Sequence, residues 1–154
     1  MRFNQWSLLL IIGLTVQLGS VPPLTGDGLT AAERAELQRQ QKIEGRIKVY
    51  QSACRRLLKT VETEVLKDDF QSVPDTLKSW LALLELAAQD IDKNESRKKK
   101  SKALIQYEIL LRKEISDVQG FKIRAPVDQQ DNFEAWLTRA EEIRKKFVDI
   151  LFPG

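Results

Sequence analysis

Apolar residues recur at alternating intervals of three and four positions in four segments of this 154-residue sequence. Because an α-helix has about 3.6 residues per turn, this spacing places an apolar stripe along one face of a helix. No segment alternates apolar and polar residues as a half-buried strand does. The sequence therefore predicts an all-α protein, an antiparallel bundle of about four helices. The stripes are Ile43, Ile47, Tyr50, Cys54, Leu57, Val61; Leu77, Leu81, Leu84, Ala88, Ile91; Leu104, Tyr107, Leu111, Ile115; and Phe133, Trp136, Ala140, Ile143, Phe147, Ile150.

The first of these helices is predicted to be the longest, from Ala31 to Val65. Thr30 and Glu33 have the spacing of a capping box, in which each residue satisfies a backbone donor of the other. Gly45 lies inside the segment, where the helix either continues as an overhang or kinks and folds back. Trp80 and Trp136 lie on apolar stripes and are expected in the core.

Turn and capping residues predict the ends of the other helices. Ser72, followed by Pro74, is expected to cap the second helix. The third is expected to follow residues 94–96, to end near Gly120 and to pack beside the second, since their connection is short. Asp128 is expected to cap the last helix.

The N-terminal residues have the layout of a secretory signal. Arg2 precedes an acid-free apolar run over residues 6–18, which is too short for a stable membrane-spanning helix and ends at small residues. We expect residues 1–20 to be a signal peptide, residues 21–29 a flexible linker and residues 30–154 one helical domain. The protein is then exported, to the periplasm or the outside of a bacterium. An uncleaved segment would instead tether it to the membrane.

The composition removes several classes of chemistry. There is no histidine, the usual general base at neutral pH and a frequent metal ligand. Cys54 is the only cysteine, so an internal disulfide is impossible, and its place on a stripe predicts a buried thiol. Lysine and arginine exceed the acidic residues by only 25 to 22, which does not favour nucleic acid as a partner. We expect no cofactor, no metal and no enzymatic activity.

One short segment concentrates positive charge. Five cations fall within six positions, at the predicted start of the third helix, where the helix dipole prefers anions. They are candidate residues for binding an anion or a partner, and anionic lipid is among the candidates. The alternative is a solvated, lysine-rich turn with no binding role. The five residues are Arg97, Lys98, Lys99, Lys100 and Lys102.

Two stretches carry a resemblance to known sequences. RKKKSKALIQYEILLRK, from Arg97 to Lys113, and APVDQQDNFEAWL, from Ala125 to Leu137, resemble small exported hypothetical proteins of acidobacterial-type soil bacteria. The resemblance implies a cell-envelope location and brings no activity, cofactor or site residue with it.

Together these features give two functional hypotheses. The first is an exported, non-enzymatic helical bundle that acts through its surfaces as an adaptor, interaction or chaperone-like protein of the envelope, with a protein or envelope component as its partner. The alternative is a binder of phosphorylated lipid or another polyanion through the segment from Arg97 to Lys102. An enzyme that uses carboxylates or a serine in an unfamiliar arrangement is the least favoured hypothesis, because no convergent motif supports it.

Overall fold

The computed structural model describes residues 26–154, and this part of the chain is helical with no strand. The predicted signal peptide at residues 1–20 and most of the predicted linker lie outside the described residues. The all-α prediction is confirmed for the described part. The elements are α1 (Ala31–Arg39), α2 (Ile43–Leu66), α3 (Val73–Asn94), α4 (Lys102–Arg124), the 3₁₀ turn η1 (Val127–Gln129) and α5 (Gln130–Leu151).

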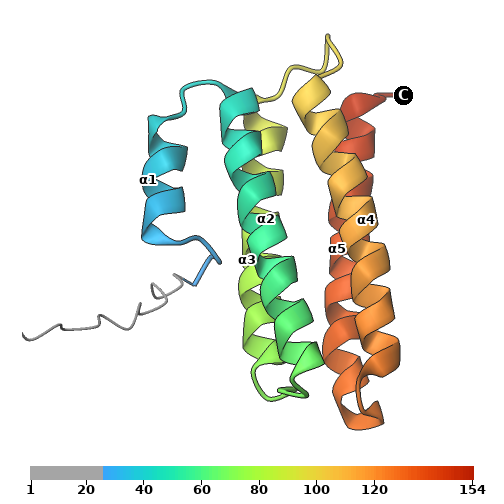
Figure 1. Cartoon of the computed structure of the whole chain (residues 1–154). Helices are drawn as coiled ribbons and strands as arrows, with labels where there is room; N and C mark the ends of the chain where they lie inside the picture. Colours follow the sequence, from blue (N-terminus) through green and yellow to red (C-terminus); the bar gives the residue numbers. More distant parts are fainter. Residues whose placement is uncertain (1–25) are drawn as a thin grey trace, which may run out of the picture.

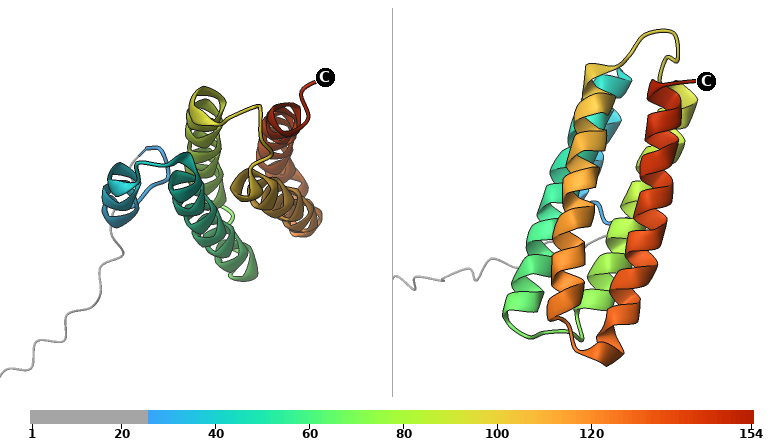
Figure 2. Two further views of the ribbon diagram at one scale, coloured as in Figure 1. Left: turned by 90° about the horizontal axis from the view of Figure 1, so that it is seen from above. Right: turned by 90° about the vertical axis from the view of Figure 1, so that its right-hand side faces the viewer.

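Helices α2, α3, α4 and α5 form a four-helix bundle, and α1 packs on the outside of α2 (Figure 1). Seen end-on, the bundle has the cyclic order α2, α3, α5, α4 (Figure 2). The pairs α2–α3 and α4–α5 are antiparallel, whereas α2–α4 and α3–α5 run parallel. The prediction that the second and third predicted helices pack together is wrong, because α3 and α4 lie diagonally opposite. Their connection crosses one end of the bundle.

The core contains most residues of the predicted apolar stripes, and both tryptophans lie in it as expected. Ile43, Leu81 and Ile115 are only partly buried and pack against the core. The Trp80 and Trp136 rings meet with their centroids 4.5 Å apart, joining α3 to α5. Tyr107 and Phe147 make a similar contact between α4 and α5, at 5.1 Å. Large aromatic pairs of this kind supply much of the apolar area that holds a small bundle together.

The prediction of one long first helix is wrong. The helix ends at Arg39, and the backbone is extended at Gln40 and Lys42, so that α1 turns back against α2. Gly45 is not the break, since α2 is helical through it. A Cβ there would lie 2.2 Å from Oε1 of Gln40, so the glycine makes room for the side chain of the turn.

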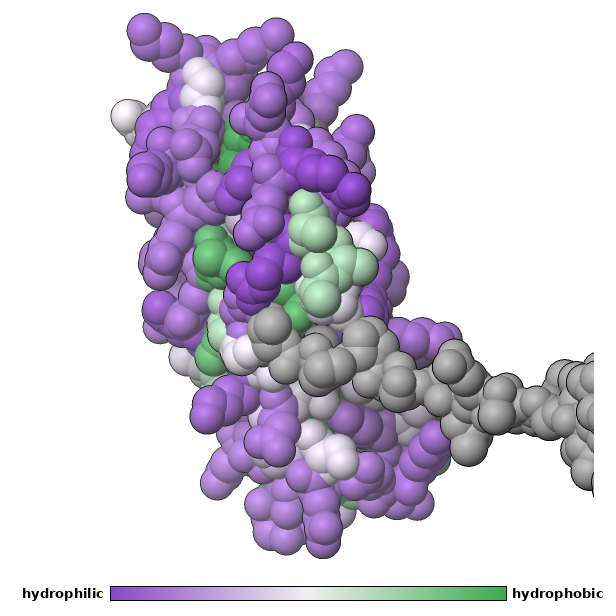
Figure 3. Space-filling view, turned by 90° about the vertical axis from the view of Figure 1, so that its left-hand side faces the viewer, coloured by the Kyte–Doolittle hydropathy of each residue, from purple (hydrophilic) through white to green (hydrophobic). Residues whose placement is uncertain are grey.

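Polar contacts, together with the buried residues Gly28 and Leu29 that precede it, hold α1 in place. The capping box of Thr30 and Glu33 is present, as predicted. Arg56 of α2 donates two hydrogen bonds to the Glu33 carboxylate, at 2.8 and 2.7 Å. Gly28 and Leu29 are buried, although the sequence placed them in a flexible linker. Figure 3 shows that the face bearing α1 is mostly hydrophilic, with apolar side chains in small patches.

Three helix ends differ from the predictions. Ser72 makes no cap hydrogen bond, because its hydroxyl donates to Asp69 at 2.7 Å instead. Gly120 is helical, and α4 continues to Arg124. Asp128 lies in η1, which precedes α5 and replaces the expected simple cap. For Ser72, the local hydrogen bond to Asp69 replaces the expected cap.

The buried face of α4 is also shifted from the predicted one. Its stripe continues from Leu111 to Glu114 and Val118, whereas Ile115 is only partly buried. Glu114 has no exposed surface, and neither carboxylate oxygen has a hydrogen-bond partner among the described residues. Burial is the main cause that raises its pKa to about 8. Glu114 is therefore a protonated core residue at neutral pH.

Candidate anion-binding surface

The five predicted binding residues lie on the connection that crosses the end of the bundle and on the first residue of α4 (Figure 1). Helix α3 ends at Asn94, and the extended Glu95 still donates its N–H to the Ile91 carbonyl at 2.8 Å. Helix α4 begins after Ser101, whose hydroxyl accepts a hydrogen bond from the Leu104 N–H at 3.2 Å. The cations therefore lie mainly in a loop, not in the first turn of a helix.

Three of the five cations are free to meet a partner. Lys98, Lys99 and Lys102 are exposed, and none forms an ion pair with a residue of the described chain. The attraction of such exposed lysines for an anion is screened by solvent and salt.

The other two cations have contacts within the protein. Arg97 forms an ion pair with Asp92 of α3. The Lys100 ammonium lies 4.2 Å from the centroid of the Phe152 ring, a cation–π contact with the segment that follows α5. The structure thus brings all five predicted residues to one end of the bundle but gives Arg97 a structural role.

Nearby carboxylates do not cancel the charge of the loop. Asp92 is compensated by Arg97. Glu95 turns inward, with one oxygen accepting the Ser96 N–H at 3.3 Å and the other buried, and this burial raises its pKa. The loop therefore presents a surplus of positive charge from Lys98, Lys99 and Lys102.

A groove of about 670 Å³ opens between this loop and the start of α2. Its walls include Lys99 and Lys102 on one side and Lys48 and Gln51 of α2 on the other. Two acidic residues, Glu44 and Glu95, also line the groove. Lys48 adds a cation from a distant part of the sequence. The groove extends the positive surface from the loop onto the adjacent helix.

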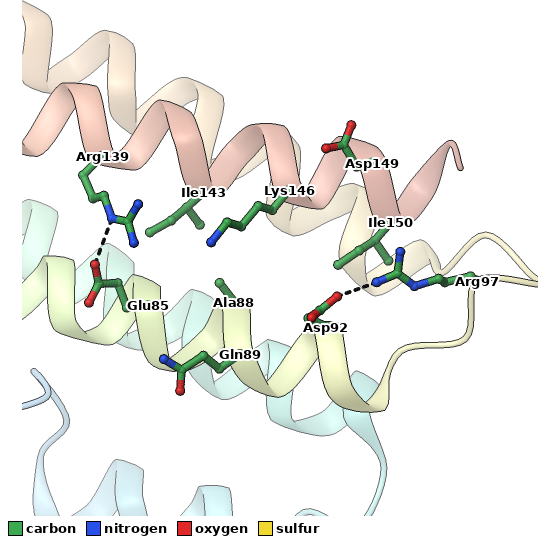
Figure 4. A pocket seen from close by; sticks show the side chains of 10 residues that line it. All are labelled: Glu85, Ala88, Gln89, Asp92, Arg97, Arg139, Ile143, Lys146, Asp149 and Ile150. Carbon is green, nitrogen blue, oxygen red and sulfur yellow. Dashed lines mark hydrogen bonds and ion pairs between the residues drawn. The ribbon is translucent and has the colours of Figure 1, made fainter. Parts of the chain in front are cut away.

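A second groove, of about 380 Å³, lies between α3 and α5 and has a different character (Figure 4). Arg139 pairs with Glu85 at 2.9 Å at one end, and Arg97 pairs with Asp92 at the other. Lys146 extends between the two helices. Because its cations and carboxylates alternate, this groove has little net charge and does not form part of the positive surface.

Phe152 is the residue of this surface that the sequence did not reveal. It falls outside the stripe that ends at Ile150, and the residue is 56% exposed. No aromatic residue lies within the basic segment itself, so nothing in that segment indicated that an aromatic ring would meet Lys100. The only available signal was an aromatic residue just beyond the end of an amphipathic pattern.

The single thiol is buried, as predicted, and its surroundings do not favour reactivity. Cys54 has no exposed surface, and its Sγ lies 3.3 Å from the Tyr107 hydroxyl. Burial, with a further effect of the charge on Glu114, raises the pKa of the thiol. Because a thiolate is the reactive form, a raised pKa makes Cys54 a poor nucleophile.

Among residues 26–154, no group of three or more cysteine, aspartate or glutamate side chains is arranged to hold a metal ion. None of the helices from α1 to α5 combines the length and apolar character needed to cross a membrane. Comparisons with protein-family models, curated proteins and solved structures found no match to this chain. The assignment of Arg97, Lys98, Lys99, Lys100 and Lys102 to binding stays a prediction that rests on geometry and charge.

Proposed function

We propose that this protein is a non-enzymatic binding protein whose basic end docks on a phosphate-rich, anionic partner. The observation that carries the proposal is the set of three exposed lysines that have no acidic partner in the described chain. Lys98 and Lys99 lie on the loop after α3, and Lys102 is the first residue of α4. Lys100 and Lys48 lie on the same surface.

The electrostatics of the loop support this role. Each lysine near an anionic surface contributes roughly 1 kcal/mol of attraction, so a cluster binds far better than isolated cations. The long, flexible stems let several ammonium groups adjust to phosphates that are not in fixed positions. The attraction should weaken steeply with salt, because the Debye length falls from about 10 Å at 0.1 M to about 3 Å at 1 M.

We also propose that the protein acts in the cell envelope. The apolar run at residues 6–18, preceded by Arg2 and followed by small residues, supports export. N-terminal sequencing of the protein recovered from the envelope fraction tests this part. A start near Val21 supports export with cleavage, an intact N-terminus in that fraction supports a tether, and recovery from the cytosol alone contradicts the proposal.

The binding proposal is tested by retention on immobilised polyphosphate over a salt gradient. The test variant combines Lys98→Gln, Lys99→Gln and Lys102→Gln. A matched control combines Lys59→Gln, Lys67→Gln and Lys78→Gln, which removes the same charge from exposed lysines nearer the other end. We expect the loop variant to elute at clearly lower salt than wild type and the control to elute close to it. Equal loss in both variants would show that only net charge matters and would refute a defined site.

A further inference from the structure

We infer that the anionic partner is the surface of a phospholipid bilayer, and that Phe152 inserts its ring there while the loop lysines contact the phosphates. This inference rests on the proposed function, since it names the source of the phosphate groups. The starting observation is Phe152, an exposed aromatic residue that belongs neither to the core nor to a helix.

Phe152 is an aromatic ring held in solvent at the end of the bundle. The helix ends at Leu151, which is buried, and the Phe152 N–H makes the last helical hydrogen bond, to the Val148 carbonyl at 2.8 Å. Phe152 as a residue is 56% exposed, so its side chain is not packed in the core. Its position is therefore fixed by the helix, but its apolar surface remains available.

The cation–π contact joins this ring to the basic loop. Lys100 lies over one part of the Phe152 ring, at 4.2 Å from the centroid, while its neighbours Lys98, Lys99 and Lys102 extend into solvent. The ring and the lysines therefore lie at the same end of the bundle and are exposed there, although the lysines are at the start of α4 and Phe152 follows α5.

A bilayer surface offers what this arrangement requires. Aromatic rings are enriched at the boundary between the headgroups and the acyl chains, and lysines extend their amines toward the phosphates. A soluble polyanion provides the phosphates but no apolar phase for the ring. An unpaired nucleic acid strand provides bases for stacking, but such platforms use successive aromatic side chains. Among residues 26–154, the basic loop has one cation–π contact, that of Lys100 with Phe152. The bundle would stand end-on, with the loop toward the membrane.

The test compares binding of full-length variants to vesicles, to polyphosphate and to single-stranded RNA. The vesicles contain phosphatidylglycerol and phosphatidylcholine, or phosphatidylcholine alone. The variants are Phe152→Ala, Phe152→Trp and the triple loop variant with Lys98, Lys99 and Lys102 changed to glutamine. Val127→Ala is the matched control, because Val127 is an exposed apolar residue at the opposite end. Residues 6–18 are common to all variants, so differences between variants report on the bundle.

We expect Phe152→Ala to weaken binding to anionic vesicles roughly fivefold, from the loss of a partly buried ring. Phe152→Trp should bind at least as tightly as wild type, since tryptophan favours the interface. Neither change should alter retention on polyphosphate, and Val127→Ala should behave as wild type. The triple lysine variant should lose roughly fivefold per lysine on anionic vesicles and should also elute earlier from polyphosphate.

Each of the other outcomes refutes either the bilayer inference or the proposed function. Unchanged vesicle binding by Phe152→Ala, with loss in the lysine variant, refutes the bilayer inference and leaves the proposed function standing. Equal weakening by Phe152→Ala on vesicles, polyphosphate and single-stranded RNA shows that the ring acts through the loop or by stacking, and also refutes the inference. Unchanged binding of the lysine variant to every probe refutes the proposed function itself. Circular dichroism of each variant checks that the bundle is intact.

Discussion

Replacement of Glu114 should remove a large pH dependence from the stability of the bundle. The carboxyl group is buried in the stripe of α4, and its pKa is raised to about 8 from the ordinary value of 4.5. Arg55 and Lys113 oppose this shift and Asp117 reinforces it, but burial is the largest cause. The folded protein therefore holds a proton that the unfolded chain releases at much lower pH.

The sign and size of the effect follow from proton linkage. Because the folded pKa is raised, the stabilisation is complete below about pH 4.5 and is lost as the pH rises toward 8. One pH unit corresponds to about 1.4 kcal/mol within this window, so the free energy of unfolding should fall by about 3 kcal/mol between pH 4.5 and pH 7 from this group alone. The loss should level off above pH 8, where the carboxylate is ionised in both states.

Urea denaturation of wild type and of Glu114→Gln at pH 5, 6, 7 and 8 measures this effect. The glutamine has nearly the same shape but does not ionise, so the variant should match wild type near pH 5 and exceed its stability by about 3 kcal/mol at pH 7. Glu134→Gln is the control, because it removes an exposed carboxylate whose surface ion pair is worth less than about 1 kcal/mol. If wild type and Glu114→Gln show the same pH slope, Glu114 is ionised in the folded state and the reasoning is refuted.

Three further predictions concern other parts of the molecule. Gly28→Ala should lower the free energy of unfolding by about 2 kcal/mol in chemical denaturation, since Gly28 has a φ of 75° and its Cβ would lie 2.5 Å from a backbone oxygen; unchanged stability would contradict this backbone geometry. Cys54 should react with a thiol reagent at pH 8 at least about 100-fold more slowly in the native protein than in denaturant, and comparable rates would show that it is accessible. Arg56→Met should cost about 1 to 2 kcal/mol and raise hydrogen exchange within α1, whereas unchanged exchange would mean that α1 does not depend on the pair with Glu33.

The helical class was predictable because the stripes extend over many turns. A periodic pattern sustained over 18 or more residues, such as that from Phe133 to Ile150, leaves little choice of structure. The capping box at Thr30 was also predictable, since its two hydrogen bonds are local and involve only residues three apart. The burial of Cys54 and Trp136 followed from the same stripes.

The break between α1 and α2 was not predictable from local signals. Gln40 and Lys42 are neither strong helix breakers nor turn residues. Contacts between residues distant in the sequence hold α1 against α2. Arg46 donates to the Leu37 carbonyl near the turn. Arg56 pairs with Glu33 at the start of α1. The diagonal order of α3 and α4 is a choice of topology that a short loop permits but does not specify. The burial of Glu114 was not predictable from its residue type, because a glutamate is rarely buried in a protein core without a partner.

Part of the candidate site was also predictable from the sequence, and part was not. The basic residues were visible in the sequence because they are contiguous, from Arg97 to Lys102. The exposure of Lys98 and Lys99, the pairing of Arg97 and the approach of Phe152 depend on how α3 and α5 end beside each other, and no local pattern reports that.

Chemical footprinting of lysines tests directly whether the basic end of the bundle is the binding surface. The protein is treated with an amine-acylating reagent, alone and bound to anionic vesicles, and modification is measured at each lysine by mass spectrometry. We expect Lys98, Lys99 and Lys102 to become protected on binding, while Lys67 and Lys78 keep their reactivity. Unchanged reactivity of the three loop lysines, with protection elsewhere on the bundle, would contradict the assignment of the basic end as the binding surface.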